Sequence, residues 1–182
     1  MGAGELLSGA RFEELFSSFS TSAYRLESRE SYYEQDELNA YLAGGPKAVP
    51  EDFLKEWFQL MRSHRSAGRT IRRVRVVSEP HSDYTRFGLW LSAKNVEAGE
   101  DIRYLPRPTA AEISVPRMDY WLFDDSRLYI VHFAADDSLL GAEQVQDDKQ
   151  VQQAREWRDV AWARAIPRAE YARAHPPKEG LD

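Results

Sequence analysis

The sequence predicts an α+β (mixed α/β) domain with one central mixed sheet and helices packed on it. Three observations predict this fold class. Residues 70–105 contain an apolar strand, an amphipathic helix and a second strand, the pattern of a parallel strand–helix–strand unit. Residues 119–145 contain three short strand-like segments joined by turns, as in an antiparallel meander. The length of 182 residues suits one domain with a sizeable core.

The sequence of residues 10–42 predicts a helix, a strand and a second helix. Apolar residues recur at helical spacing from Ala10, in F-E-E-L-F-S-S-F. The segment S-A-Y-R-L-E-S-R, residues 22–29, alternates apolar and polar side chains and predicts a strand. Residues 33–42 predict a short helix, which Gly44-Gly45-Pro46 ends.

The central elements follow from turn and capping residues. Proline suits the first turn of a helix, serine and aspartate suit an N-cap, and glycine suits a helix end. The elements expected here are a helix from Pro50 to Ala67, a strand over 70–77, a helix capped by Ser82 or Asp83 and closed by Gly99, and a strand over 101–105.

The C-terminal half predicts a meander and a last helix. The elements are a proline-containing loop over 106–116, a hairpin of 119–123 and 127–133 across Asp124-Asp125-Ser126, a strand over 139–145, and a helix from Asp147 or Asp148 to about Ala165. We expect residues 1–9 to be a flexible N-terminus, residues 10–166 to form the single domain, and residues 167–182 to be a disordered tail.

Composition excludes several classes of function. The net charge is -6, and such an acidic chain is not expected to bind nucleic acid directly, because that affinity comes mainly from neutralising phosphates. The absence of cysteine excludes disulfides and thiolate chemistry. No signal peptide or membrane-spanning stretch is visible. We therefore expect a cytoplasmic protein.

The turn S-E-P-H-S-D-Y, residues 78–84, is the main candidate for chemistry. A histidine and carboxylates in a short turn can perform acid–base work, and the following helix N-terminus attracts anions. The alternative interpretation is that Ser82 or Asp83 caps the helix, Pro80 shapes the turn and His81 is simply exposed. The contacts expected for a ligand or partner are Glu79, His81, Asp83, Tyr84, Arg86, Arg103 and Arg107.

A cluster of arginines is the second candidate. Arg69, Arg72, Arg73 and Arg75 precede or occupy the strand over 70–77, and Arg103 and Arg107 join them from the next strand. Arg73 and Arg75 point the same way, and Arg72 points opposite to them. Arginines on a strand can hold phosphate or carboxylate groups. The alternatives are an edge strand protected by charge, or ion pairs with the many carboxylates.

No metal site or cofactor is expected. Asp119, Asp124 and Asp125 have carboxylates suited to a hard cation, yet Asp124-Asp125-Ser126 is also typical turn chemistry. The four histidines lack helical i, i+4 pairing, and no nucleotide-binding loop or serine-nucleophile motif is present. Whether the protein is an enzyme stays open at this point.

Several segments together resemble a family of uncharacterised actinobacterial proteins of the streptomycete type. They are F-E-E-L-F, Y-R-L-E-S-R-E-S-Y, R-R-V-R-V-V-S-E-P-H-S-D-Y-T-R-F, A-G-E-D-I-R-Y-L-P-R, D-Y-W-L-F-D-D-S-R-L and R-D-V-A-W, across residues 11–165. Members of this family are often encoded beside helix-turn-helix regulators. The resemblance implies a regulatory or toxin–antitoxin-like accessory role and supplies no catalytic residues.

We therefore expect a regulatory or accessory binding protein that acts with a DNA-binding regulator or senses a small anionic ligand. The alternative is a small hydrolase or phosphodiesterase-like enzyme that uses His81 as base, with Arg103 in the same pocket. A third interpretation is a scaffold whose last helix forms a homodimer through Trp157 and Trp162, because aromatic residues are frequent interface anchors.

Overall fold

A mixed β-sheet forms the centre of the molecule. The computed structural model describes residues 6–176, and in this part of the chain eight strands pair in the order β1-β7-β6-β5-β2-β3-β4-β8. The three central parallel strands are β2 (Ser22–Glu27), β3 (Thr70–Val77) and β4 (Asp101–Pro106). The fold class predicted from the sequence is confirmed.

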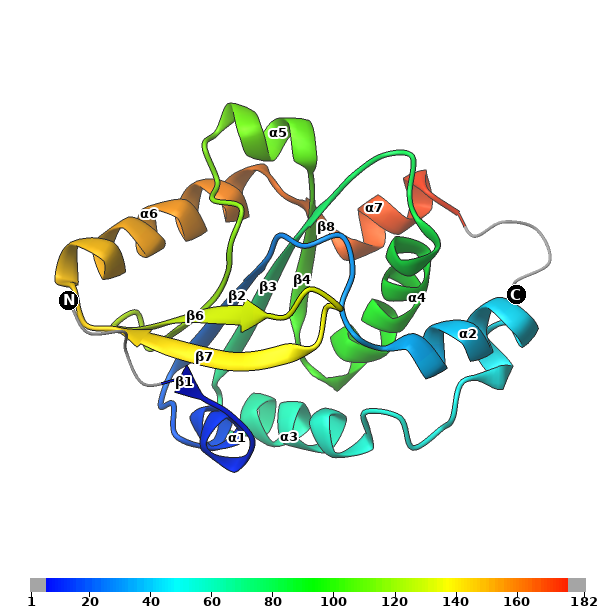
Figure 1. Cartoon of the computed structure of the whole chain (residues 1–182), viewed down its shortest axis with the longest axis horizontal. Coiled ribbons are helices and arrows are strands. Elements are labelled where there is room, and N and C mark those ends of the chain that lie inside the picture. Colours follow the sequence, from blue (N-terminus) through cyan, green and yellow to red (C-terminus); the bar gives the residue numbers. More distant parts are fainter. Residues whose placement is uncertain (1–5, 177–182) are drawn as a thin grey trace.

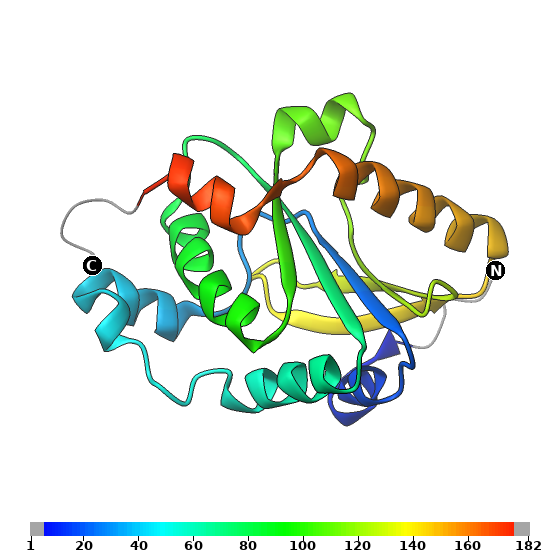
Figure 2. The ribbon, with the colours of Figure 1, turned by 180° about the vertical axis from the view of Figure 1, so that it is seen from behind.

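Helices cover both faces of the sheet, as Figures 1 and 2 show from opposite sides. One face is covered by α1 (Ala10–Ser17), α3 (Lys55–Ser66) and α4 (Asp83–Ala98), and the other by α5 (Arg107–Glu112) and α6 (Asp148–Arg164). Each face has its own buried core. Phe16 and Phe87 belong to the first core, and Leu26 and Leu122 belong to the second.

The predicted strand–helix–strand unit is formed by β3, α4 and β4, whose two strands are parallel neighbours. Ser82 is the N-cap of α4, because its hydroxyl oxygen accepts a hydrogen bond from the backbone N–H of Thr85 at 3.1 Å. Gly99 ends the helix with a φ of 122°, a conformation that glycine adopts without strain. Both capping predictions are confirmed, with Ser82 rather than Asp83 at the N-cap.

The predicted antiparallel meander is also confirmed. It consists of β5 (Asp119–Phe123), β6 (Arg127–Phe133) and β7 (Leu139–Val145). Asp124 and Asp125 have φ angles of 51° and 57°, as tight hairpin turns require. The Asp124 carboxylate accepts backbone N–H bonds from Ser20, Thr21 and Ser22 at 2.7–3.2 Å. This turn therefore ties the hairpin to the start of β2.

The N-terminal helices agree with the sequence except at one boundary. α1 begins at Ala10 as predicted, and α2 (Gln35–Gly44) occupies nearly the predicted range. A short 3₁₀ turn, η1 (Pro46–Ala48), follows. α3 begins at Lys55 instead of Pro50, because Leu54 has a φ of 60° in the left-handed region, which a right-handed helix cannot accommodate.

The expected loop over 106–116 contains the short helix α5. Pro106 precedes α5 and Pro108 lies in its first turn. Proline is tolerated there because the first-turn N–H groups have no partner within the helix. Two of the three prolines that suggested a loop therefore stand at the start of a helix.

Both chain ends differ from the expectation of flexible segments. The elements found there are β1 (Leu6–Leu7), which pairs with β7, β8 (Ile166–Pro167), which pairs with β4, and α7 (Arg168–Ala174). Order extends through α7 because Tyr171 is only 1% exposed and stacks on Tyr104, with ring centroids 4.8 Å apart. The rest of the two expected flexible ends, residues 1–5 and 177–182, lies outside the described residues.

Candidate functional site

Two neighbouring strands place four charged side chains on one face of the sheet centre. Arg25 and Glu27 come from β2, and Arg73 and Arg75 come from β3; Arg25 lies beside Arg73, and Glu27 beside Arg75. Side chains alternate between the faces of a strand, so all four point towards α1, α3 and α4, while Leu26 points the other way. We call these four residues the charged floor.

Ion pairs hold the charged floor together. Oε1 of Glu27 lies 2.9 Å from Nε of Arg25 and 3.0 Å from Nη1 of Arg73. Oε2 of Glu27 lies 3.6 Å from Nη1 of Arg75. Burial alone would raise the pKa of Glu27, but the guanidinium groups of Arg73, Arg25 and Arg75 outweigh burial and lower this pKa to about 2. Glu27 therefore stays ionised in the interior.

A second buried carboxylate connects the floor to α3. Glu100 lies between α4 and β4, and its Oε2 is 2.8 Å from Nη2 of Arg73. Its Oε1 accepts a hydrogen bond from the indole N–H of Trp57 at 2.7 Å. Burial would lower the pKa of Arg73, but Glu100 and Glu27 raise it above its usual value. Arg73 is thus fully paired and fixes the position of Trp57 through Glu100.

A third buried carboxylate, Asp119 of β5, closes the network. It accepts a hydrogen bond from the Tyr32 hydroxyl at 2.6 Å and one from the backbone N–H of Ser28 at 2.8 Å. Its Oδ2 also lies 3.5 Å from Nη2 of Arg25. The three arginines are therefore matched by three carboxylates, those of Glu27, Glu100 and Asp119, and the network is electrically balanced.

An open pocket of about 560 Å³ lies above the charged floor. Its walls include the aromatic side chains of Phe16, Trp57, Tyr84, Tyr104 and Trp121. Small-molecule sites typically have volumes of roughly 300–1,000 Å³, mostly apolar walls and a few polar groups that orient the ligand. The volume and lining of this pocket agree with that description.

Arg75 is the least well paired of the three arginines. Its closest carboxylate oxygen in an ion pair is 3.6 Å away, and its guanidinium carbon lies 5.5 Å and 5.2 Å from the ring centroids of Tyr32 and Tyr84. A Cβ at Gly88 would lie 2.8 Å from Nη1 of Arg75. The glycine therefore allows α4 to approach the guanidinium, which stays available beside the pocket.

Besides Nε of Arg25, which is already ion-paired with Oε1 of Glu27 at 2.9 Å, four buried polar atoms on pocket-lining residues have no hydrogen-bond partner among the described residues. They are Nη2 of Arg75, Nε1 of Trp121, Oε2 of Glu27 and Oδ1 of Asn95. The first two are donors and the last two are acceptors. A buried polar atom without a partner costs about 1–3 kcal/mol. A molecule in the pocket that hydrogen-bonds to these atoms would remove that cost.

Of the residues predicted from the sequence, Tyr84 lines this pocket. Its hydroxyl donates a hydrogen bond to Glu34 at 2.7 Å. Burial raises the pKa of Tyr84, which is therefore a neutral phenol at physiological pH. Tyr84 can thus offer an aromatic face to a ligand while its hydroxyl is held by Glu34.

The turn residues Glu79 and His81 lie beside α7 instead. The Tyr171 hydroxyl donates a hydrogen bond to Glu79 at 2.7 Å and lies 2.6 Å from Nε2 of His81. Burial, followed by the nearby His175, lowers the pKa of His81. This small cluster is separate from the residues that line the pocket.

The remaining predicted residues are spread over three places. Asp83 and Arg86 pair with each other at 3.2 Å. Arg103 points to the opposite sheet face, where it donates to the Trp162 carbonyl at 3.0 Å. Arg107, after β4, lies 2.6 Å from Glu30. Arg86 also donates a hydrogen bond to the backbone carbonyl of His81 at 2.8 Å. The structure does not bring Arg103 and Arg107 together with His81 in one pocket.

The sequence contained part of the signal for the charged floor. It indicated correctly that Arg73 and Arg75 point the same way. The edge-strand alternative is wrong, because β3 lies between β2 and β4. The ion-pair alternative is right for Arg73 and Arg75. Arg25 and Glu27 were missed, although the alternation in Y-R-L-E places them on one face of β2.

The fold and the pocket define a class of protein, an α+β domain with a pocket of small-molecule size above a buried ion network. The chain belongs to the family described as a domain of unknown function, DUF6879, whose sequence model matches residues 10–173. The resemblance to an uncharacterised family is therefore confirmed. A comparison with curated proteins finds no match. None of the described helices has the length and apolar character needed to cross a membrane.

Proposed function

We propose that this protein binds a small molecule in the pocket above the charged floor and acts as a ligand-sensing regulatory module. The observation that supports this proposal is the group of four polar atoms without a hydrogen bond, on residues that line a pocket of about 560 Å³. Native proteins rarely leave buried polar atoms without partners. A ligand with matching donors and acceptors accounts for all four.

The pairing of the charges narrows the chemistry of the ligand. Nη2 of Arg75 and Nε1 of Trp121 require acceptors, while Oε2 of Glu27 and Oδ1 of Asn95 require donors. The three arginines of the charged floor are balanced by three buried carboxylates, so the pocket offers no excess positive charge to a simple anion. The preferred ligand is a small, flat molecule with a carboxylate or carbonyl group for Arg75 and an N–H group for Glu27.

The sequence led us to expect a small anionic ligand, and the ligand class proposed here is wider, because either a carboxylate or a neutral carbonyl group can face Arg75. The family resemblance implied a role beside a DNA-binding regulator. We therefore propose that ligand binding in the pocket changes how the protein binds that regulator. The hydrolase alternative has less support, because Arg103 points to the α6 face while His81 contacts Tyr171 of α7.

The test is calorimetric titration of the purified protein with three probes: tryptophan, guanosine and benzoate. Tryptophan and guanosine combine a flat ring with donors and acceptors, and at least one of them should bind. Benzoate lacks an N–H donor and should bind more weakly. If neither tryptophan nor guanosine binds, or if benzoate binds best, the proposed ligand chemistry is wrong.

Two variants connect binding to the unpaired atoms. The amide N–H of Asn95 donates only to the Leu91 carbonyl of its own helix, and alanine suits a helix, so Asn95→Ala should fold. The variant lacks Oδ1 and should weaken binding by about 5–10-fold, the effect of one hydrogen bond. Trp121→Phe keeps an aromatic side chain, removes the N–H donor and should weaken binding to a similar extent. Asn39→Ala, on the surface of α2, is the matched control. Wild-type affinity in both pocket variants would contradict the proposal.

A further inference from the structure

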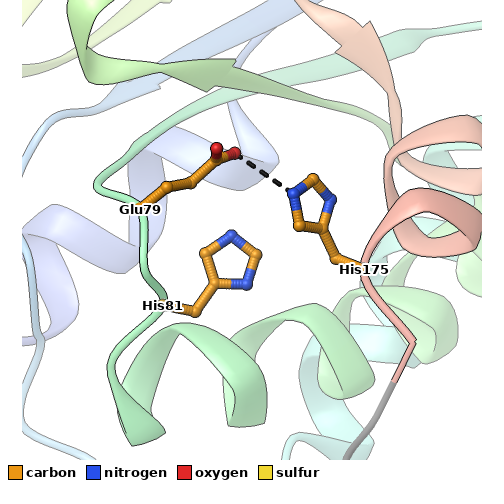
Figure 3. Close-up of side chains that lie close together, drawn as sticks. All are labelled: Glu79, His81 and His175. Atoms are coloured by element: carbon orange, nitrogen blue, oxygen red, sulfur yellow. Dashed lines mark ion pairs between the residues drawn. The ribbon is translucent and has the colours of Figure 1, made fainter.

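A second cluster of possible ligand atoms lies at the surface beside α7. Figure 3 shows Glu79 and His81, from the segment between β3 and α4, facing His175 at the end of α7. One carboxylate oxygen and one ring nitrogen from each histidine all lie within 4.8 Å of one another. We propose that Glu79, His81 and His175 bind a zinc-type divalent transition-metal ion.

The distances suit such an ion. Nε2 of His175 lies 3.3 Å from Oε1 of Glu79. Zinc bonds of about 2.0–2.2 Å in tetrahedral geometry place two ligand atoms about 3.3–3.6 Å apart. The pair thus already has the separation of two ligands on one ion. Because Glu79 is exposed and the histidines are partly exposed, small side-chain rotations can bring His81 to the same point.

The hydrogen bonds of His175 leave the correct nitrogen free. Its Nδ1 lies 2.9 Å from the Tyr171 carbonyl oxygen, which can only accept, so Nδ1 carries the proton. In the neutral ring, Nε2 then has a lone pair that faces the Glu79 carboxylate. In that neutral ring the two acceptors, 3.3 Å apart, repel each other, and either a proton on Nε2 or a metal ion bound between them removes the repulsion.

A buried tyrosine orients the other two ligands. The Tyr171 hydroxyl donates to Oε1 of Glu79 at 2.7 Å and lies 2.6 Å from Nε2 of His81. Tyr171 itself is held by stacking on Tyr104, with ring planes 5° apart. Metal sites typically have such outer partners, which fix the orientation of the ligands. One buried residue therefore positions all three side chains.

The donor set indicates the kind of ion. Two imidazoles and one carboxylate suit zinc, cobalt or nickel, whereas calcium and magnesium prefer oxygen ligands alone. Three protein ligands leave at least one position for water. The sequence did not predict this site, because Glu79 and His81 lack a recognised metal spacing and His175 lies in the segment that was expected to be disordered.

The test uses calorimetry with zinc chloride on the full chain after treatment with a chelator. We expect saturable binding of one ion per chain. Glu79→Gln and His175→Asn should each lower the affinity by more than about tenfold. His132→Asn is the matched control, because His132 forms a pair with Glu143 at 3.1 Å and belongs to no three-ligand group among residues 6–176. This control should bind zinc as the wild type does.

Thermal unfolding gives a second readout. Zinc should raise the melting temperature of the wild type and of His132→Asn by mass action, and should not do so for Glu79→Gln. The Glu79 side chain is exposed, so the variant should fold normally. Absence of saturable zinc binding would overturn the proposal. Wild-type affinity in both Glu79→Gln and His175→Asn would also overturn it.

Discussion

Replacing Glu27 with glutamine tests how strongly the charged floor stabilises the fold. Glu27→Gln keeps the size of the side chain and removes its charge. Arg25, Arg73 and Arg75 would then share two buried carboxylates, those of Glu100 and Asp119. Breaking a buried ion pair from one side leaves an uncompensated charge, which is strongly destabilising.

The magnitude follows from the pKa of Glu27. This pKa is about 2 in the folded protein against an ordinary value of 4.5, and each unit corresponds to about 1.4 kcal/mol. The ionised carboxylate therefore contributes about 3 kcal/mol to the free energy of unfolding at neutral pH. Because the folded pKa is lowered, this contribution is complete above 4.5 and is lost as the pH falls towards 2. About 1 kcal/mol should be lost by about pH 4.

The assay is urea unfolding of the wild type, Glu27→Gln and a control, Glu30→Gln, at neutral pH and at about pH 4. Glu30 pairs with Arg107 at 2.6 Å, but its side chain is 52% exposed. Such surface pairs contribute roughly 0–1 kcal/mol. The difference between the wild type and Glu27→Gln should be about 3 kcal/mol at neutral pH and about 2 kcal/mol at about pH 4.

Two outcomes would refute this reasoning. One is a similar loss of stability in Glu27→Gln and Glu30→Gln, which would mean that burial adds nothing to the ion pairs of Glu27. The other is a difference between the wild type and Glu27→Gln that stays constant as the pH falls, which would mean that the pKa of Glu27 is not lowered by folding.

Two further substitutions test local features. Gly88→Ala should lower the melting temperature and reduce the free energy of unfolding by about 1–3 kcal/mol, because the new methyl group would lie 2.8 Å from Nη1 of Arg75. Helix propensity alone predicts a higher melting temperature for alanine, and that result would contradict this account. Asp124→Asn should lower the free energy of unfolding in urea by about 1–3 kcal/mol, because it weakens charge-assisted bonds to three backbone N–H groups. Asp125→Asn, which loses only a surface pair with Arg158, should cost less than about 1 kcal/mol, and equal losses in the two aspartate variants would refute this role of Asp124.

The central elements could be predicted from the sequence because their signals are local. Alternation in residues 22–29, the caps at Ser82 and Gly99, and the turn at Asp124 each depend on residues that are close in the chain. The short C-terminal helix α7 lacks such a signal. Tyr171 orders it by stacking on Tyr104, a contact between residues far apart in the sequence.

The candidate site depends even more on distant contacts. The sequence showed that Arg73 and Arg75 share a face. It could not show that Glu27 lies beside Arg75, because that depends on the register between β2 and β3. It also could not place Glu100 against Arg73. A charged residue in the sequence indicates its role only when its ion-pair partner is known. Strand pairing determines that partner.

The stacking of Tyr171 on Tyr104 determines how far a fragment of the chain must extend at its C-terminal end to keep the pocket intact. A shortened chain that stops at residue 166, the domain boundary expected from the sequence, would lose the ring that supports Tyr104, a residue of the pocket wall. It would also lose the hydrogen bond from Arg168 to the Leu89 carbonyl at 2.9 Å and half of β8, leaving the edge of β4 open to association with other chains. Fragments made for binding studies should therefore extend through α7.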